Sequence, residues 1–513
     1  MPTYKVKVKW GKETYTDVEV NTDEDPLVFK AQIFALTGVQ PERQKVMVKG
    51  TTLKDGDWGN TKLRDGATIL LMGSKEEDVP VEPTEKPLFV EDMNESELAS
   101  ALDLPAGLTN LGNTCYMNAT VQCLKTVPEL REALRDFKGG VTLSGEMIPA
   151  QSITAALRDL YESMEKGATI PPILLLEVLH MAFPRFAEKS EHGGFTQQDA
   201  NECWTEMVRM LQQKLPPKTA EGQTSTFKSL VDQYFGGTFN VELKCTESED
   251  EPPSHSIENF LQLSCFISQD VRYMHSGLRS KMQEQITKLS PSLQRDAVYT
   301  KTSKISRLPA YLTVQFVRFY YKEREAINAK ILKDVKFPLD FDAFELCTPE
   351  LQQKLTPMRS KFKGECTTHC TVFIIVHEYE DKRVEESQAD KTDKGDDGEK
   401  AKMKAVPFWF ENDLGSNNSG YYTLQAVLTH RGRSSSSGHY VAWVRQKEDT
   451  WIKCDDDTVS PVTSDDVLKL SGGGDWHCAY VLLYGPRILE VPAEESETSA
   501  SASSSVNTPS VLL

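Results

Sequence analysis

The feature that most constrains this chain is a glycine-punctuated loop, from Gly107 to Thr114, which leads directly into Cys115. The residues from Met117 to Leu124 have the pattern of a helix, so Cys115 is expected at a helix N-terminus. There, the helix dipole and the unpaired N–H groups favour a thiolate, which is the nucleophilic form of cysteine. The loop therefore predicts nucleophilic catalysis by Cys115. The alternative is a buried structural cysteine.

Two further residues of this loop suit an active site. Gly112 lets the backbone turn sharply and approach a ligand closely, and Asn110 can direct a side-chain amide N–H at an oxyanion. The segment from Gly107 to Ala119 resembles the cysteine box of the ubiquitin-specific proteases, which are papain-like deubiquitinating enzymes. The resemblance implies that Cys115 is the nucleophile and that Asn110 belongs to the oxyanion hole.

A general base is expected far downstream, on a rigid element that faces the nucleophile. His439 follows Gly438 and opens an alternating apolar strand. The segment from Tyr422 to Tyr440 resembles the histidine box of the same family, and the resemblance implies that His439 is the base. The alternatives are His430 and His477, although neither has the Gly-His-Tyr context.

The orienting carboxylate is expected on the next strand. Residues 451–457 are predicted to pair with the strand of His439 as a hairpin, which would bring a carboxylate close to the imidazole. By the family pattern this third member is Asp455, which would hold the tautomer of His439 and stabilise its cation. Asp456 competes for this role, because adjacent strand residues point to opposite faces.

The segment at 195–202 resembles a further box of the family. Asp199 is predicted to cap the helix that follows, which is a purely structural role. In the family this segment helps to build the cleft beside the nucleophile. The resemblance therefore makes Gln197 and Gln198 candidate substrate contacts, together with Tyr440 beside the predicted base.

The segment at 307–319 resembles the third family box, a central strand. Many relatives carry two CxxC pairs in this region, which bind zinc in a fingers subdomain. This chain has only Cys245 and Cys265 there, and tetrahedral zinc requires four ligands. We therefore expect no metal and no other cofactor. The Cys/His cluster at 366–370 precedes an apolar strand and is interpreted as structural.

Residues 4–74 are expected to form a separate small domain. Its order of strand, strand, helix, strand and strand resembles the ubiquitin fold, a β-grasp. Asp25 fits the N-cap of the helix and Gly38 its C-cap. The domain ends at Gly73 and Ser74, without the Arg-Gly-Gly tail of ubiquitin, so the resemblance implies docking and not conjugation. Alternation within 45–49 predicts that Met47 is exposed.

The remaining organisation follows from composition shifts and periodicity. Residues 75–103 are acidic and proline-containing and are interpreted as a linker, with a short helix at 96–102. One large α+β domain, with the thumb, palm and fingers that the resemblance implies, is expected over 104–485. Disorder is expected at 380–404 and 493–513. The main helices are predicted at 120–134, 152–164, 171–183 and 199–215, and the clearest strands at 234–244, 261–266 and 312–319.

Charge and cysteine content limit the partners and the compartment. A net charge of −18 argues against general binding to nucleic acid. The chain has no apolar run long enough to span a bilayer, so no integral membrane segment is expected. Ten irregularly spaced cysteines in 513 residues do not form a disulfide framework, which indicates a reducing compartment, the cytoplasm or the nucleus. We expect a monomer when the protein is free.

These four boxes, the segment of Asp455 and the N-terminal domain together resemble the proteasome-associated type within the ubiquitin-specific proteases. The resemblance implies that the small domain docks on the proteasome regulatory particle. The large domain would then trim ubiquitin from polyubiquitinated proteins. A non-catalytic ubiquitin-binding scaffold is the main alternative, and a protease for another ubiquitin-like modifier is a further one.

A regulatory site is predicted in the serine-rich loop before His439. Arg431, Arg433 and Ser436 have the spacing of a basophilic kinase site, although serine-rich loops often match such motifs by chance. A phosphate on Ser436 would add about two negative charges beside the cleft. The loop is therefore a candidate for gating.

Overall fold

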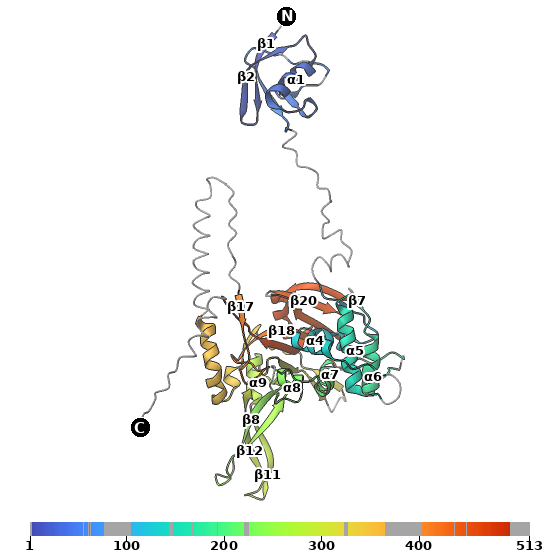
Figure 1. Cartoon of the computed structure of the whole chain (residues 1–513), viewed down its shortest axis with the longest axis vertical. Helices are drawn as coiled ribbons and strands as arrows, with labels where there is room; N and C mark the ends of the chain where they lie inside the picture. Colours follow the sequence, from blue (N-terminus) through green and yellow to red (C-terminus); the bar gives the residue numbers. More distant parts are fainter. Residues whose placement is uncertain are drawn as a thin grey trace, which may run out of the picture. The chain divides into compact units, whose positions relative to one another are not determined.

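The structure is a computed structural model of the whole chain, and it divides into two compact units, Met1–Met93 and Asn94–Leu513 (Figure 1). The description covers residues 3–54, 56–59, 61, 63–75, 104–142, 147–166, 169–191, 193–219, 225–322, 327–364, 403–435, 437–447 and 449–492. The predicted linker helix, the Cys/His cluster at 366–370, residues 380–402 of the predicted insertion and the tail at 493–513 lie outside these residues. The last two residues of that insertion, Met403 and Lys404, begin a short strand and are not disordered as expected.

The first unit is a five-stranded sheet with one long helix. The sheet order is β2-β1-β5-β3-β4, with β1 and β5 parallel and the other pairs antiparallel. This is the predicted order of elements, with the short strand β4 added. The elements are β1 (Thr3–Trp10), β2 (Glu13–Asn21), α1 (Pro26–Thr37), a short 3₁₀ helix (Pro41–Arg43), β3 (Lys45–Val48), β4 (Thr51–Thr52) and β5 (Thr68–Met72).

Capping residues fix both ends of α1 as predicted. The Asp25 side chain accepts a hydrogen bond from the Leu27 N–H, and Pro26 occupies the first helical position. At the other end, Gly38 adopts a left-handed conformation with φ 73°, which a residue without Cβ adopts easily. These contacts satisfy orphan backbone groups, so a helix of only three turns is stable against the sheet.

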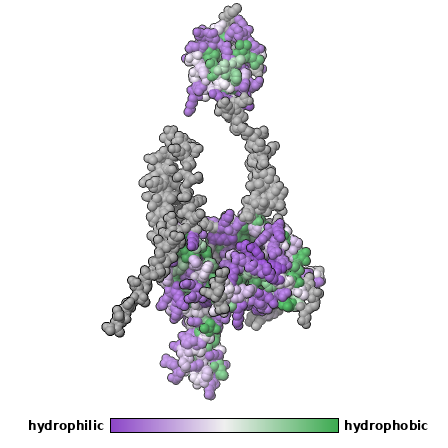
Figure 2. Space-filling model, in the orientation of Figure 1, coloured by the Kyte–Doolittle hydropathy of each residue, from purple (hydrophilic) through white to green (hydrophobic). Residues whose placement is uncertain are grey.

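Alternation along the strands separates a core from an outer face. Val46 and Val48 are buried and Met47 is partly exposed between them, which confirms the predicted facing. Helix α1 has no such separation of apolar and polar faces, because large apolar side chains on its outer surface are exposed to solvent. Figure 2 shows an apolar area on this unit, and the large apolar residues that α1 exposes are Leu27, Val28, Phe34 and Leu36.

The second unit begins with a helical half. The predicted helix at 120–134 is wrong, because the chain forms two helices there. Pro128 starts the second helix and holds Val127 in an extended conformation, which breaks the first one. The main elements are α3 (Cys115–Leu124), α4 (Pro128–Asp136), α5 (Pro149–Met164), α6 (Ile173–Ala182) and α7 (Ala200–Lys214), with the parallel pair β6 (Gly107–Leu108) and β7 (Thr169–Ile170).

A large sheet forms the second half of this unit, in the order β10-β13-β22-β18-β19-β20-β21, with β16 paired to β18. Only the β10–β13 pair is parallel. The strands are β10 (Leu263–Phe266), β13 (Leu312–Val317), β16 (Asp340–Asp342), β18 (Tyr421–Arg431), β19 (His439–Arg445), β20 (Thr450–Asp455), β21 (Thr458–Thr463) and β22 (Cys478–Pro486).

A second sheet of long hairpins, β11-β12-β8-β9, projects away from the large sheet (Figure 1). The expected strand at 234–244 starts later than predicted, because Tyr234 ends a short helix and the strand begins at Gly237. The elements of this region are α8 (Leu230–Tyr234), β8 (Gly237–Cys245), β9 (Ser254–Phe260), α9 (Met274–Lys281), β11 (Gln283–Ser290) and β12 (Arg295–Arg307).

Shorter elements connect and border these sheets. They are β14 (Phe319–Lys322), β15 (Ile327–Lys330), β17 (Met403–Val406), α11 (Ser464–Leu468), β23 (Leu489–Pro492), a helix at 349–364, and 3₁₀ turns at Pro184–Ala187, Phe344–Leu346 and Lys469–Ser471. Among the helices described, none combines the length and the apolar character needed to cross a membrane.

Strand β19 joins the two hydrophobic cores of this unit. Tyr440, Ala442 and Val444 pack with the helical half, whereas Val441 and Trp443 point into the core on the other face. This is the alternation expected of a strand buried on both faces. The residue that opens β19, His439, is therefore anchored between two packed layers.

Candidate active site

The loop before α3 places Cys115 at the first position of that helix, as predicted. Thr114 is the N-cap residue, and two residues before it adopt left-handed conformations, Gly112 with φ 102° and Asn113 with φ 56°. The Asn113 side chain donates a hydrogen bond to the Phe195 carbonyl, which ties the loop to the segment before α7. Cys115 is 1% exposed, so its side chain is almost completely shielded from solvent.

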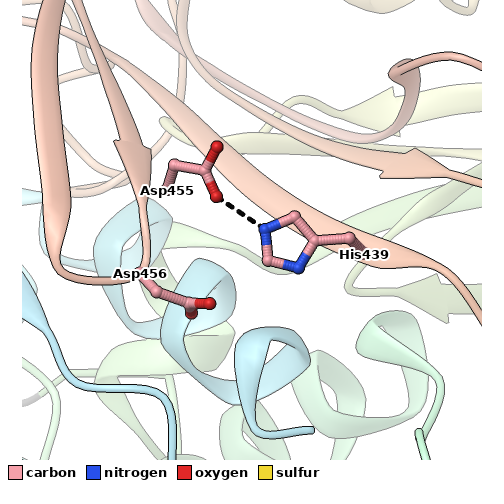
Figure 3. Close-up of side chains that lie close together, drawn as sticks. All are labelled: His439, Asp455 and Asp456. Atoms are coloured by element: carbon pink, nitrogen blue, oxygen red, sulfur yellow. Dashed lines mark hydrogen bonds and ion pairs between the residues drawn. The ribbon is translucent and has the colours of Figure 1, made fainter.

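The β19–β20 hairpin brings His439 and Asp455 together (Figure 3). His439 begins β19 and Asp455 ends the antiparallel strand β20, so both lie at the same end of the hairpin. The distance between His439 Nε2 and Asp455 Oδ1 is 2.6 Å. This contact is the one expected between a base and its orienting carboxylate.

The hydrogen bond from His439 to Asp455 controls the protonation of both groups. This bond, followed by one with Cys115, raises the pKa of His439 to about 10. The same bond, with help from Lys453 Nζ at 2.8 Å, lowers the pKa of Asp455 below its usual range. These contacts favour the protonated form of His439, which lies between the Asp455 carboxylate and the cysteine sulfur.

Two more donors point at the sulfur of Cys115. Gln197 Nε2 lies 3.1 Å from Cys115 Sγ, and the backbone N–H of Tyr440 donates to the same atom at 3.4 Å. Gln197 Nε2 also donates to the carbonyl of Gly438, at 2.9 Å. The sulfur thus faces hydrogen-bond donors from the helical half and from the sheet, which is an environment suited to negative charge.

Asp456 does not contact the imidazole through a hydrogen bond. It follows the end of β20 in a left-handed conformation with φ 54°, which turns its carboxylate toward the loop before α3. There it accepts hydrogen bonds from Asn110 Nδ2 and Asn118 Nδ2, both at 2.8 Å. Its backbone carbonyl accepts from the Leu108 N–H. Of the two candidate carboxylates, Asp455 is the one that holds His439.

The competing bases occupy enclosed positions. Burial lowers the pKa of His430 to about 3 and that of His477 to about 4. His430 Nε2 lies 2.9 Å from the Ser437 carbonyl, and His477 Nδ1 lies 3.1 Å from Thr429 Oγ1. Among the described residues, neither is hydrogen-bonded to Cys115 or to a carboxylate, so His439 is the base that the geometry favours.

The other predicted site residues are Gln198, Tyr440 and Ser436. The first two differ in their positions relative to Cys115. Gln198 Nε2 donates to Thr196 Oγ1 at 2.8 Å, beside the cleft. The Tyr440 ring is buried against His430 and Tyr480, so Tyr440 reaches the site through its backbone N–H. Ser436 lies outside the described residues.

Two residues of the site were not predicted. Asn118 is buried in an otherwise apolar turn of α3, and a buried amide on such a face requires hydrogen-bond partners. Lys453 lies two residues before Asp455, so it is on the same face of β20. The positions of Asn118 on its helix and of Lys453 on its strand could be read from the sequence. The residues that they contact could not.

The acidic groups here also raise the question of a metal. Ligand atoms of His439, Asp455 and Asp456 all lie within 4.8 Å of one another. However, the Asp455 carboxylate is already paired with His439 and the Lys453 ammonium, and Asp456 binds two amides. Carboxylates with these partners are suited to orienting a catalytic imidazole and are poorly suited to binding a metal cation.

Known protein families match both units. Residues 106–484 match the family "Ubiquitin carboxyl-terminal hydrolase", and residues 5–76 match the "Ubiquitin family". The matches confirm the expected α+β fold, a ubiquitin-like β-grasp unit together with a ubiquitin-specific protease domain.

Similar proteins span almost the whole chain. "Ubiquitin carboxyl-terminal hydrolase 6" of Arabidopsis thaliana is 40% identical, with 96% of this chain and 100% of that protein covered. "Ubiquitin carboxyl-terminal hydrolase 14" of Caenorhabditis elegans is 41% identical, with 94% of each chain covered. "Ubiquitin carboxyl-terminal hydrolase 6" of Schizosaccharomyces pombe is 39% identical, with 93% and 98% covered. By its matched catalytic domain and these full-length relatives, the chain belongs to the ubiquitin carboxyl-terminal hydrolase family, the thiol-dependent deubiquitinating enzymes.

Proposed function

We propose that this protein hydrolyses the isopeptide bond after the C-terminal glycine of ubiquitin, with Cys115 as nucleophile, His439 as acid and base, and Asp455 as the orienting carboxylate. The observation that carries the proposal is the 2.6 Å bond between His439 Nε2 and Asp455 Oδ1, with Cys115 hydrogen-bonded to the same imidazole. This leaves the second ring nitrogen of His439 for the nucleophile and the leaving group.

The reaction proceeds in two steps. The Cys115 thiolate attacks the carbonyl carbon of the terminal glycine, and a tetrahedral intermediate forms. His439 then gives its proton to the departing lysine amine, the C–N bond breaks, and a thioester remains. In the second step His439 removes a proton from water, the hydroxide attacks the thioester, and the Cys115 thiolate leaves as the ubiquitin carboxylate forms.

The oxyanion of each intermediate requires donors beside Cys115. We assign this role to the Cys115 backbone N–H and to the Asn110 amide. Asn110 Nδ2 carries two hydrogens, and its bond to Asp456 engages one of them. The side-chain oxygen of Asn110, Oδ1, accepts hydrogen bonds from the Gly112 and Thr114 N–H groups. These bonds hold the side-chain amide in a fixed orientation. A fixed donor stabilises developing charge without reorganisation.

We assign the first contacts with the ubiquitin tail to Gln197, Gln198 and the backbone of Tyr440. The Gln197 amide lies against the sulfur of Cys115, so a tail that reaches the nucleophile also reaches this group. Gln198 lies next to it on the segment that leads to α7, whose N-terminus Asp199 caps by accepting from the Asn201 and Glu202 N–H groups.

We also propose that the ubiquitin-like unit docks the enzyme on the proteasome regulatory particle, so that it trims polyubiquitinated proteins in the cytoplasm or nucleus as a monomer. The support is the match of residues 5–76 to the ubiquitin family, at a segment that lacks a diglycine end. The exposed apolar residues of α1 and β5 supply contact area for a partner.

Ser436 is proposed as a regulatory phosphorylation site. Its loop is tied to the segment before β22, since Gly432 N–H donates to the Asp475 carbonyl and Arg433 pairs with the Asp475 carboxylate at 3.0 Å. A phosphate would compete for Arg433 and loosen this tie. An S436D variant with unchanged turnover would argue against the switch.

The test of the proposed function is turnover of a fluorogenic ubiquitin C-terminal amide. The full chain is assayed alone and with purified proteasomes that lack their own copy. Turnover that rises with proteasomes supports an enzyme that docking activates, and turnover that is equal in both conditions removes this activation while keeping the hydrolytic function. A chain that binds ubiquitin and is inactive in both conditions would instead be a non-catalytic scaffold.

A further inference from the structure

A second buried histidine lies directly behind the catalytic loop. His430 is the penultimate residue of β18, and it pairs with Tyr440 across the β18–β19 hairpin. Its side chain is 0% exposed, so it does not reach substrate. Its Nε2 lies 2.9 Å from the carbonyl of Ser437, two residues before the catalytic His439.

The neighbouring carbonyl is also held by a side chain. The Gly438 carbonyl accepts from Gln197 Nε2 at 2.9 Å, and the same nitrogen contacts Cys115 Sγ. The two consecutive carbonyls before His439 are thus fixed from different parts of the fold, one by the hairpin itself and one by the segment that precedes α7. Their orientation sets the direction in which the chain enters His439.

The surroundings of His430 determine which nitrogen carries its proton. Nε2 faces a carbonyl, which only accepts, so the hydrogen lies on Nε2. Nδ1 is buried and has no hydrogen-bond partner among the described residues. The ring meets Phe319 edge-on, and the Lys330 ammonium donates to the His430 backbone carbonyl. Burial, together with that ammonium, keeps the imidazole neutral by lowering its pKa to about 3.

The fit between this ring and the loop is close. Gly438 has φ 107°, and a Cβ there would lie 2.7 Å from His430 Nε2 and 2.1 Å from the Arg431 carbonyl. A side chain at Gly438 would therefore displace either the imidazole or the strand backbone. The loop can adopt its observed path only with a glycine against this ring.

We propose that His430 is a positioning residue for the hydrolytic reaction. Its Nε2–H holds the Ser437 carbonyl, and this contact fixes the peptide that presents His439 to Cys115 and Asp455. The inference rests on the proposed function and adds a requirement that the triad alone does not contain. A displacement of about 1 Å at a reacting group can cost roughly a hundredfold in rate, so one such bond is enough to matter.

Two substitutions separate the hydrogen bond from simple packing. H430F keeps a flat ring of similar size but cannot donate, whereas H430Q places an amide N–H the same number of atoms from Cα. We expect H430F to lower kcat by about a hundredfold with little change in KM. H430Q should recover most of that loss. Melting temperatures of both variants provide the control for folding.

The second readout is the pH dependence of kcat/KM, whose alkaline limb reports the protonated imidazole of His439. If His430 positions His439, the bond to Asp455 that raises the pKa of His439 is weakened in H430F. The alkaline limb then lies at lower pH than in the wild type, and H430Q returns it toward the wild-type value. A residue that only contributes stability would leave this profile unchanged.

The outcomes distinguish the inference from the proposed function. A wild-type chain without turnover removes the proposed function and the inference with it. An active wild type, with H430F equally active or with H430Q no better than a well-folded H430F, removes the inference alone. If H430F does not fold, ring ¹⁵N resonances of the wild type decide. A neutral Nε2–H tautomer at pH 7 supports the inference, and an Nδ1–H or charged His430 overturns it.

Discussion

The side-chain amide of Asn110 lies 2.8 Å from the carboxylate of Asp456 and joins the loop that precedes Cys115 to the hairpin that carries His439. Asp456 is adjacent to Asp455, yet its left-handed backbone turns it away from His439. The carboxylates of Asp455 and Asp456 therefore contact different parts of the site. One holds the imidazole, and the other holds the amide assigned to the oxyanion.

This relationship predicts coupling between Asn110 and Asp456. N110A should lower kcat by about 10²–10³, the usual effect of removing one oxyanion donor. D456A should lower kcat as well, because it releases the amide. If Asp456 acts through Asn110, the double variant should be little slower than N110A alone. Additive losses in steady-state turnover would contradict this.

The pH dependence of turnover should distinguish the two aspartates. The catalytic His439 must carry a proton to release the amine, so kcat/KM should fall as pH rises through about 10. D455N removes the largest cause of the raised pKa of His439, whose ordinary value is 6.5. The alkaline limb should therefore move to lower pH in D455N and stay in place in D456N. An unmoved limb in D455N would show that Asp455 does not hold the base.

Removal of the nucleophile should separate chemistry from binding. C115A should have no detectable turnover, because Cys115 is the one thiol of the described residues that is hydrogen-bonded to His439. The same variant should bind ubiquitin with an affinity close to that of the wild type, since the cleft keeps its donors. Calorimetry with ubiquitin and the fluorogenic assay measure the two properties. Turnover by C115A would remove the assignment.

Local chemistry allowed much of this arrangement to be predicted. The cap at Asp25 follows from its place before Pro26, and the closeness of Asp455 to His439 follows from the predicted hairpin. The pairing of Cys115 with these two residues was predicted from the resemblance to the family boxes. Pro128 could also have predicted the break between α3 and α4. The break was missed because the residues on both sides of Pro128 have helical periodicity.

Contacts between distant segments could not be predicted in the same way. The choice between Asp455 and Asp456 depends on a single φ angle in the turn after β20. Gln197 reaches Cys115 across 82 residues, and the buried Arg318 donates to backbone carbonyls of Ala479 and Ser471 more than 150 residues away. Such contacts exist only once the helices have packed on the sheet.

The stability of the ubiquitin-like unit offers a test away from the active site. D25A removes the cap of α1 and should lower the free energy of unfolding of this unit by about 1 kcal/mol. Hydrogen exchange in peptides that cover Pro26–Thr37 measures the change in the full chain. D23A, which removes an exposed carboxylate outside the helix, should have little effect. Equal exchange in D25A and the wild type would contradict the capping role.

The most direct test of the central claim uses ubiquitin that carries an electrophile in place of its C-terminal carboxylate. The full chain contains ten cysteines, and tryptic mass spectrometry identifies which of them forms the covalent adduct. We predict a single adduct on Cys115, absent from C115A and slowed in D455N. An adduct on another cysteine, or equal labelling of C115A, would show that the thiol at the start of α3 is not the nucleophile.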